Sequence, residues 1–200
     1  IARVLGYDNL PTNDINLEKL SNKIPSKSVE TFLRKTLTLE GFSEVINSPF
    51  VENQSSNCFT VDNPLDSNRN SMRTSLRESL INNLLYNERR QKDSVKFFEI
   101  SDVYCVNDKK LVRQKKLGII ASGRIGNNYK EFSQQINKNY LNDILVSKLS
   151  VSDSIIENLS RENLDTKIKT PIFYTEIDLK EINGLEADSD LLKDIKKEIR

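Results

Sequence analysis

The sequence predicts an α+β domain, in which helices pack against an antiparallel β-sheet. Two segments, 29–41 and 74–90, repeat apolar residues with helical spacing and carry the signals of helix ends. Several other segments are short apolar runs rich in Val, Ile, Phe and Tyr, which is typical of strands. Helices and strands alternate too irregularly for a repeated βαβ pattern, so a parallel α/β sheet is disfavoured.

The first expected helix covers residues 29–41, with Ser28 as its N-cap and Gly41 as its stop. Its apolar face contains Val29, Phe32, Leu33, Thr36 and Leu37. The next segment, 42–51, has the composition of a strand. Pro49 must lie at an edge or an end of that strand, because proline donates no backbone hydrogen bond.

Residues 58–64 predict a second short strand that runs into a turn at Asn63 and Pro64. The clearest helix of the chain follows over 74–90, with Ser71 or Thr74 as its cap. Its expected core face contains Leu76, Leu80 and Leu84, with either Ile81 or Leu85.

The second half of the chain predicts three strands and one helix. Strands are expected at 94–106 and 115–123, joined by a basic hairpin-like connection, and at 170–179. The helix is expected at 140–150. We divide the chain into the end of a preceding helical domain (1–15), a linker (16–27) and a core domain (28–200). Because the chain starts at Ile1 and its only methionine is Met72, we expect it to be a piece of a longer product.

Composition excludes several functional classes. The chain has 200 residues, of which 36% are hydrophobic and 30% charged, and this balance is too polar for a membrane span. Its net charge of +1 provides no overall field that would attract nucleic acid. There is no histidine, and the two cysteines, Cys58 and Cys105, are far apart. His-dependent catalysis and nearly every zinc site are therefore excluded, and a reducing cytosol is the expected setting.

Arg73 stands at the start of the second expected helix, where the helix dipole disfavours a cation. One interpretation is structural: a buried arginine that satisfies carbonyls or a carboxylate such as Glu99, and so holds the preceding turn against the helix. The other is functional: an arginine aimed at phosphate or at a tRNA backbone. We favour the structural interpretation, because most lone arginines are solvated or paired rather than catalytic.

Weaker signals have ordinary explanations. The basic run 109–116 could touch RNA phosphates, although a solvated hairpin face is the simpler explanation. Gly123 and Gly126 form the G-x-x-G spacing of an RNA-binding KH loop, but without the flanking helices of that module we interpret them as a turn. The two cysteines are expected to act as small packing residues.

The order of the motifs resembles a known family. A helix is followed by GFSEVINSPFV (41–51), an NPL turn (63–65), MRTSL (72–76) opening a helix, and FFEI (97–100) with Val103 and Tyr104. This series resembles the core of class II aminoacyl-tRNA synthetases, and most closely the β subunits of bacterial phenylalanyl-tRNA synthetases. The residues that form the expected structural signature are Asn63, Pro64, Leu65, Arg73, Ser75, Leu76, Phe98 and Glu99.

The resemblance implies a cytoplasmic subunit of a ligase that joins phenylalanine to tRNA(Phe) with ATP and Mg²⁺. It implies an assembly of two α and two β chains, in which the α chain is catalytic. It places a candidate subunit interface at the first helix and strand, at Phe32, Leu33, Leu37, Pro49 and Phe50. No catalytic residue, metal ligand or nucleotide site is expected within this segment alone.

One departure from the family pattern supports this expectation. In catalytic class II domains an aromatic residue at the end of the strand after this helix precedes Arg-x-Glu, and the arginine holds the ATP α-phosphate. Here Cys105 stands in place of the arginine and Asn107 in place of the glutamate. We therefore expect the segment to be inactive by itself and to serve as scaffold and assembly surface. The alternative is a stand-alone RNA-binding or protein-interaction module built on a synthetase-like fold.

Overall fold

The computed structural model describes residues 29–52, 58–107, 110–126, 133–151, 155–162, 164 and 168–182, together with residues 3 and 6. The expected end of a preceding domain and the linker therefore lie outside the described residues, apart from residues 3 and 6. Gly6 has a φ of +79°, in the left-handed region that suits glycine at a helix end.

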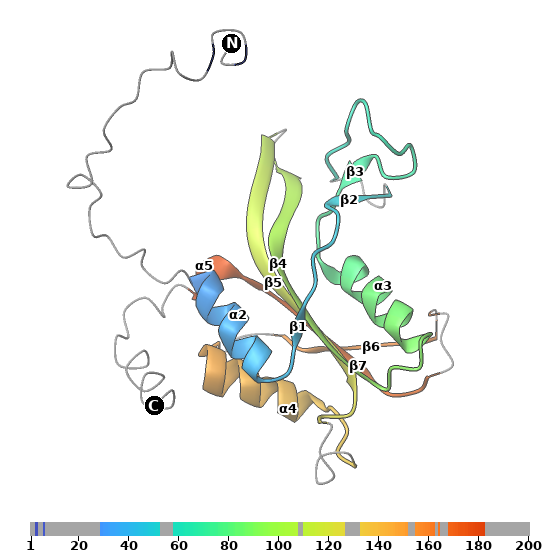
Figure 1. The fold of residues 1–200 in the computed structure, drawn as a ribbon, viewed down its shortest axis with the longest axis vertical. Helices are drawn as coiled ribbons and strands as arrows, with labels where there is room; N and C mark the ends of the chain where they lie inside the picture. The colour runs from blue at the N-terminus through green and yellow to red at the C-terminus, as the bar shows by residue number, and fades with distance from the viewer. Residues whose placement is uncertain are drawn as a thin grey trace, which may run out of the picture.

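The described helices are α2 (Val29–Leu39), α3 (Arg77–Glu88), α4 (Lys138–Asp143), which continues into the π-helical turn η3 (Ile144–Lys148), and α5 (Leu179–Ile182). The strands are β1 (Ser43–Glu44), β2 (Phe50–Val51), β3 (Ser71–Met72), β4 (Ser94–Asn107), β5 (Lys110–Gly123), β6 (Glu157–Leu159) and β7 (Ile172–Asp178). Figure 1 shows them in place.

Five strands form one sheet in the order β1-β4-β5-β7-β6. All of its neighbouring strands are antiparallel except the edge strand β1, which runs parallel to β4 with Ser43 opposite Phe97. The other two strands, β2 and β3, form a separate antiparallel ribbon. The predicted α+β class, with helices on a mainly antiparallel sheet, is confirmed.

The β4–β5 hairpin extends beyond the rest of the sheet. Ser94 to Asn107 pair in continuous register with Gly123 back to Lys110. Strand β7 joins β5 only from Lys116 onward, so among the described residues the outer part of the hairpin pairs only with itself. In Figure 1 this outer part lies beside the β2–β3 ribbon.

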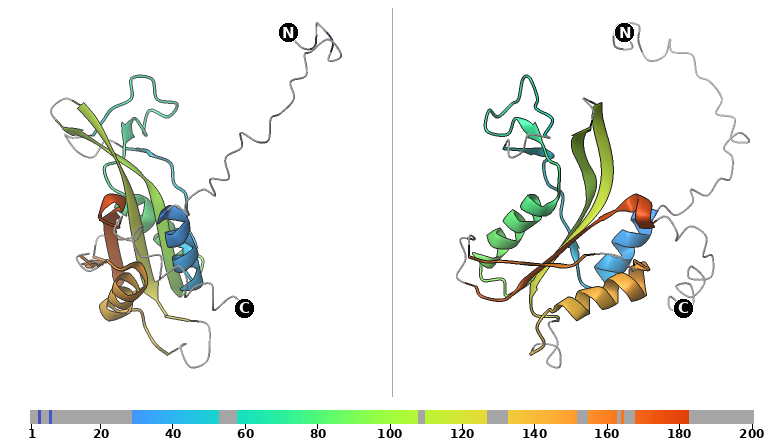
Figure 2. Two further views of the ribbon diagram at one scale, coloured as in Figure 1. Left: turned by 90° about the vertical axis from the view of Figure 1, so that its left-hand side faces the viewer. Right: turned by 180° about the vertical axis from the view of Figure 1, so that it is seen from behind.

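Helices cover both faces of the sheet, as Figures 1 and 2 show. On one face, α2, α4, η3 and α5 pack against the alternating residues Phe98, Leu117 and Ile119. On the other face, α3 packs its leucines against β4, β5 and β7. Because side chains alternate along a strand, each central strand contributes to two cores.

The helices predicted at 29–41 and 74–90 are confirmed in type and core face, whereas the one predicted at 140–150 is α-helical only up to Asp143 and continues as the π-helical turn η3. In α2, Leu33 and Leu37 are buried and Gly41 has a φ of +81° just after the helix. In α3, Leu80, Leu84 and Leu85 are buried. In both helices, the apolar stripe that the residue spacing indicates therefore faces the sheet.

Three predicted boundaries were wrong. Segment 42–51 is not one strand: β1 and β2 belong to different sheets, and the chain crosses between them through Pro49. Segment 58–64 forms only an isolated bridge, from Thr60 to Ser71. The expected basic connection belongs to β5 itself from Lys110 onward, since charged side chains are stable along a solvent-exposed hairpin.

Candidate functional site

The centre of the α3 face is a buried ion pair between Arg73, just after β3, and Glu99 of β4. Arg73 Nη1 lies 2.8 Å from Glu99 Oε1, and both side chains are 2% exposed. The predicted pairing of Arg73 with Glu99 is confirmed. A charge pair so far from water needs further polar partners, because each ion has lost its hydration.

Arg73 finds those partners at the base of the long hairpin. Its Nη2 donates to Ser101 Oγ at 2.6 Å, and its Nε donates to the carbonyl of Asp102 at 3.3 Å. Its backbone N–H donates to the carbonyl of Pro49 at 2.9 Å, and its own carbonyl accepts from Tyr104 N–H at 2.9 Å. The side chain and the backbone of one residue thus join three segments that are distant in sequence.

Glu99 continues the network toward α3. Its Oε2 accepts from Asn47 Nδ2 at 2.7 Å, and its Oε1 accepts from the Asn47 backbone N–H at 3.3 Å. The Asn47 side-chain oxygen in turn accepts from Asn83 Nδ2 of α3 at 2.9 Å. The segment between β1 and β2 is therefore fixed against both the sheet and the helix.

A second polar cluster surrounds Glu176 of β7. Its Oε2 accepts from Ser75 Oγ at 2.6 Å and from Leu76 N–H at 3.0 Å, and it also accepts from the Tyr174 hydroxyl. Lys116 Nζ lies 2.8 Å from its other oxygen. The start of α3 is thus capped by a carboxylate of a distant strand and not by Ser71 or Thr74, which corrects the predicted cap. Ser71 lies in β3, while Ser75 Oγ accepts from Arg77 N–H at 3.1 Å.

These contacts change two pKa values. Burial alone would raise the pKa of Glu176, but hydrogen bonds from Lys116, Ser75 and Tyr174 outweigh it and hold the pKa below the ordinary 4.5. Burial, together with the neighbouring Glu176 carboxylate, raises the pKa of Tyr174 well above its ordinary value. Glu176 is therefore ionised and Tyr174 neutral at pH 7.

Helix α3 fills the middle of this face with leucine side chains. A Cβ atom built on Gly118 of β5 would lie 2.8 Å from Leu80 Cδ1 and 3.1 Å from Leu76 Cβ. Only a glycine allows so close an approach of the helix to the strand. No space for a substrate is left between Gly118 and these two leucines.

Cys105 lies on the same face, two residues beyond Val103 of β4. It is half-buried, and its Sγ lies 3.9 Å from the carbonyl of Val112 across the hairpin. A thiol carries no positive charge, so it cannot offset the negative charge of a phosphate as an arginine does. Asn107 is exposed at the end of the strand.

Four of the cations described on the α3 side of the sheet have carboxylate partners. Besides the Arg73 pair, these pairs are Lys116–Glu176, Arg161–Glu88 and Arg77–Glu157. Arg161 also donates to Ser122 Oγ at 2.9 Å, so a further buried network closes the far end of the sheet. These four cations stabilise the fold and are not free to neutralise a triphosphate.

The candidate interface residues divide into two groups. Leu33 and Leu37 are 0% exposed in the chain's own core, so a partner cannot reach them in the folded domain. Phe32 and Pro49 are half-buried, and Phe50 is 43% exposed. The exposed apolar residues Leu39 and Ile46 were not among the predicted interface residues, because local spacing does not show which apolar side chains the fold leaves in solvent.

Of the signature residues, the structure brings Arg73, Ser75, Leu76, Phe98 and Glu99 to the middle of the sheet, with Phe98 on the α2 side. Asn63, Pro64 and Leu65 lie apart from them, in the loop before β3. There they line a cavity of about 270 Å³ together with Phe50.

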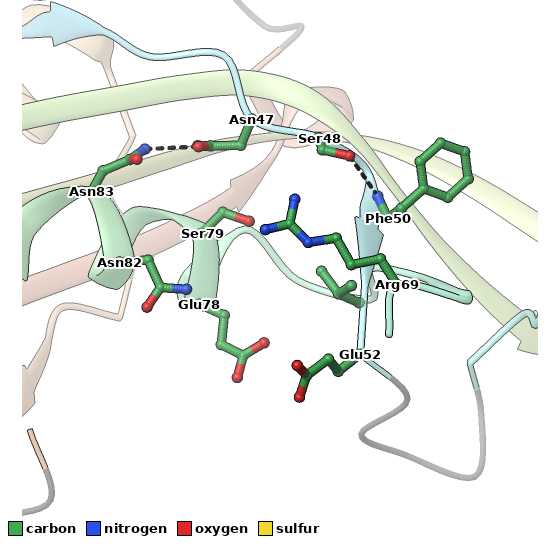
Figure 3. Close-up of a pocket in the computed structure, with 10 residues that line it drawn as sticks. Asn47, Ser48, Phe50, Glu52, Arg69, Glu78, Ser79, Asn82 and Asn83 are labelled. Carbon is green, nitrogen blue, oxygen red and sulfur yellow. Dashed lines mark hydrogen bonds between the residues drawn. The ribbon is translucent and has the colours of Figure 1, made fainter. Parts of the chain in front are cut away.

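A larger cavity adjoins this one between β2 and α3. It has a volume of about 460 Å³, and its walls include Asn47, Ser48, Arg69, Glu78 and Asn82. Figure 3 shows polar side chains converging on it from three segments, those around Ser48, Arg69 and Asn82. The two cavities share Ser48, Phe50 and Arg69, and we call them together the β2–α3 groove.

Two kinds of site were not found in the part of the chain that the structure describes. No three His, Cys, Asp or Glu residues gather there in a way that could hold a metal ion. None of its helices combines the length and apolarity needed to cross a membrane.

Comparisons with known proteins identify the family. Residues 14–167 match the family described as the phenylalanyl tRNA synthetase beta chain CLM domain. A phenylalanine–tRNA ligase beta subunit of Dehalococcoides mccartyi is 32% identical over 116 residues, covering 52% of this chain and 14% of that one. The corresponding subunit of Mesoplasma florum is 28% identical over 181 residues, covering 84% of this chain and 22% of that one. The chain therefore spans less than a quarter of the length of these relatives.

Solved structures support the fold. Two structures of a pyrrolysyl-tRNA synthetase from Desulfitobacterium hafniense superpose with a TM-score of 0.55, at 14% and 15% identity. They cover 84% of this chain and 71% or 72% of theirs. At this identity the likeness shows a shared synthetase fold and no shared activity. On the family match, which covers most of its length, the chain belongs to the phenylalanyl-tRNA synthetase β-chain CLM domain family.

Proposed function

We propose that this chain is a non-catalytic segment of a phenylalanine–tRNA ligase β subunit, which acts as scaffold and assembly surface for a catalytic α subunit. The observation that carries the proposal is the filled α3 face of the sheet. Leu76 and Leu80 occupy the space above Gly118, and Cys105, which supplies no positive charge, stands where a phosphate-binding arginine would be needed. The described cations Arg73, Arg77, Lys116 and Arg161 are paired with carboxylates, so none of these four is free to offset the charge of ATP.

The whole enzyme would join phenylalanine to tRNA(Phe), with ATP and Mg²⁺ bound by the α subunit, in an assembly of two α and two β chains in the cytoplasm. These properties are carried over from the family to which the chain belongs. The stand-alone RNA-binding module is less well supported, because Arg73, Arg77, Lys116 and Arg161 all have carboxylate partners.

The assembly surface would be formed by the accessible residues near α2 and β2. Phe50 is 43% exposed, and Leu39 and Ile46 are 76% and 92% exposed. Large apolar side chains left in solvent on neighbouring segments are typical of a surface that a partner covers. Leu33 and Leu37 would support this surface from beneath and would not contact the partner.

Co-purification with the α subunit encoded in the same genome tests the proposal. Wild-type chain is expected to retain the α subunit, and Phe50→Asp is expected to lose it while keeping its thermal melting profile. Val146→Asp is the matched control, because Val146 is 46% exposed on η3 and lies outside the proposed surface. The proposal fails if the wild-type chain does not bind the α subunit.

A further inference from the structure

The β2–α3 groove has two chemically different ends. At one end Val61, Pro64 and Leu65 form a mainly apolar wall with Phe50, which Asn63 and Asp66 border. At the other end Ser79, Asn82 and Asn83 of α3 present hydroxyl and amide groups. Arg69 lies where the two cavities meet, since it lines both.

Arg69 differs from the other arginines of this region. Its side chain is exposed and makes no ion pair with any described residue, whereas Arg73 and Arg77 each face a glutamate. In Figure 3 its guanidinium points into the cavity toward α3, near Ser79. A guanidinium in this position can donate two hydrogen bonds at once to a carboxylate or a phosphate.

Hydrogen bonds fix the wall of the groove on the α3 side. Asn47 and Asn83 are hydrogen-bonded to each other, and Asn47 is bonded to Glu99, which is paired with the buried Arg73. This wall is therefore formed before any ligand arrives, which lowers the entropic cost of binding.

The charged residues that line the groove favour one of two possible classes of ligand, nucleic acid or polypeptide. Glu52 and Glu78 line the polar end, and Figure 3 shows their carboxylates facing each other below Arg69. A nucleic-acid backbone would bring several phosphates past these two carboxylates to meet one arginine, which is unfavourable. A polypeptide can place a single carboxylate on Arg69 and keep the rest of the segment neutral or basic.

We propose that the β2–α3 groove binds an extended segment of the α subunit. An apolar side chain of that segment fills the end formed by Phe50, Pro64 and Leu65, and an Asp or Glu next to it pairs with Arg69. Its backbone amides meet the side chains of Ser79 and Asn82. This inference rests on the proposed function, and it adds the binding groove and the chemistry of the segment that the groove selects.

Affinity measurements test the charge contact. The α subunit is titrated onto the β chain carrying Arg69→Glu, with Lys92→Glu as control because Lys92 is exposed outside the groove and its reversal changes the net charge equally. Arg69→Glu is expected to weaken binding by at least about tenfold, and Lys92→Glu by less than about twofold. Equal effects of the two variants would overturn the groove while leaving the proposed function intact.

A photo-crosslinking residue at Leu65 then identifies the occupant. The proposal predicts a crosslink to one α-subunit peptide that contains Asp or Glu, and reversal of that residue to Arg should restore binding to Arg69→Glu. A crosslinked peptide without an acidic residue, or a crosslink to RNA or to a second copy of this chain, would overturn the inference. If wild-type chain does not bind the α subunit at all, it is the proposed function that fails.

Discussion

The carboxylate of Glu176 caps helix α3 from a strand one hundred residues away: its Oε2 accepts the backbone N–H of Leu76 at 3.0 Å. The first turn of a helix leaves N–H groups without partners, and a negative charge there also interacts favourably with the helix dipole. The same oxygen accepts from Ser75 Oγ, so the entry of α3 is fixed to β7. The packing of the helix on the sheet thus depends on one ionised side chain.

Replacement of Glu176 by Gln should destabilise the domain by about 1–3 kcal/mol at pH 7, because the donors of Ser75, Leu76 and Lys116 lose their charged acceptor. The folded-state pKa of Glu176 lies below 4.5, so its contribution is complete above that pH and is lost as the pH falls through the folded-state value. Urea denaturation of both proteins between pH 7 and pH 3 should show their stability difference shrinking below pH 4.5. A difference that stays constant over this range would contradict the assigned role.

The buried pair gives a larger effect. Glu99→Gln leaves Arg73 charged at 2% exposure without a carboxylate, and we expect a loss of about 3–5 kcal/mol in the free energy of unfolding. Glu157→Gln is the control, because its pair with Arg77 is exposed and contributes about 1 kcal/mol or less. Chemical denaturation of the two variants should separate them clearly. Equal losses would mean that the network around Arg73 does not hold the ribbon to the hairpin.

Gly118→Ala tests the close contact between α3 and β5. The added methyl group would lie 2.8 Å from Leu80 Cδ1 and 3.1 Å from Leu76 Cβ, and we expect a loss of about 1–3 kcal/mol because these two leucines must shift to admit it. Leu80→Ala in the same chain removes the clashing atom, so the double variant should lose less than the sum of the single losses. Strictly additive losses in thermal or urea unfolding would argue against this contact.

Shortening a side chain should affect stability differently on the two sides of α2. Leu33→Ala is expected to destabilise the domain by about 2–5 kcal/mol, because Leu33 is fully buried. Leu39→Ala, at 76% exposure, should change stability by no more than about 0.5 kcal/mol. A pull-down with the α subunit completes the test, since only the Leu39 change should weaken binding without loss of the fold.

The sequence correctly predicted those helices and strands whose signals lie within their own residues. The leucine spacing of α3 and the apolar run of β7 were sufficient, and the position of Arg73 before a helix correctly indicated a strong partner such as Glu99. The cap of α3 could not be predicted, because the residue that provides it lies in β7. The single strand expected over 42–51 was wrong, because its composition does not reveal that the chain leaves one sheet for another at Pro49.

The β2–α3 groove could not be predicted for a similar reason. Its walls come from three separate segments, around Ser48, Arg69 and Asn82, and each segment alone looks like an ordinary polar surface. Only the fold brings Arg69 opposite α3. Leu33 and Leu37, predicted at an interface but buried in the core, illustrate the opposite limit, since an apolar residue that fits a partner and one that fits the core have the same spacing in a helix.

Amino-acid-dependent ATP–pyrophosphate exchange tests the central claim most directly. It would be measured on this chain alone, on the α subunit alone and on their mixture, with phenylalanine as substrate. The account predicts no exchange by this chain alone, and exchange only where the α subunit is present. Exchange by this chain alone would contradict the account, because it would require a phosphate-binding site on a sheet face where Leu76 and Leu80 fill the space and Cys105 supplies no positive charge.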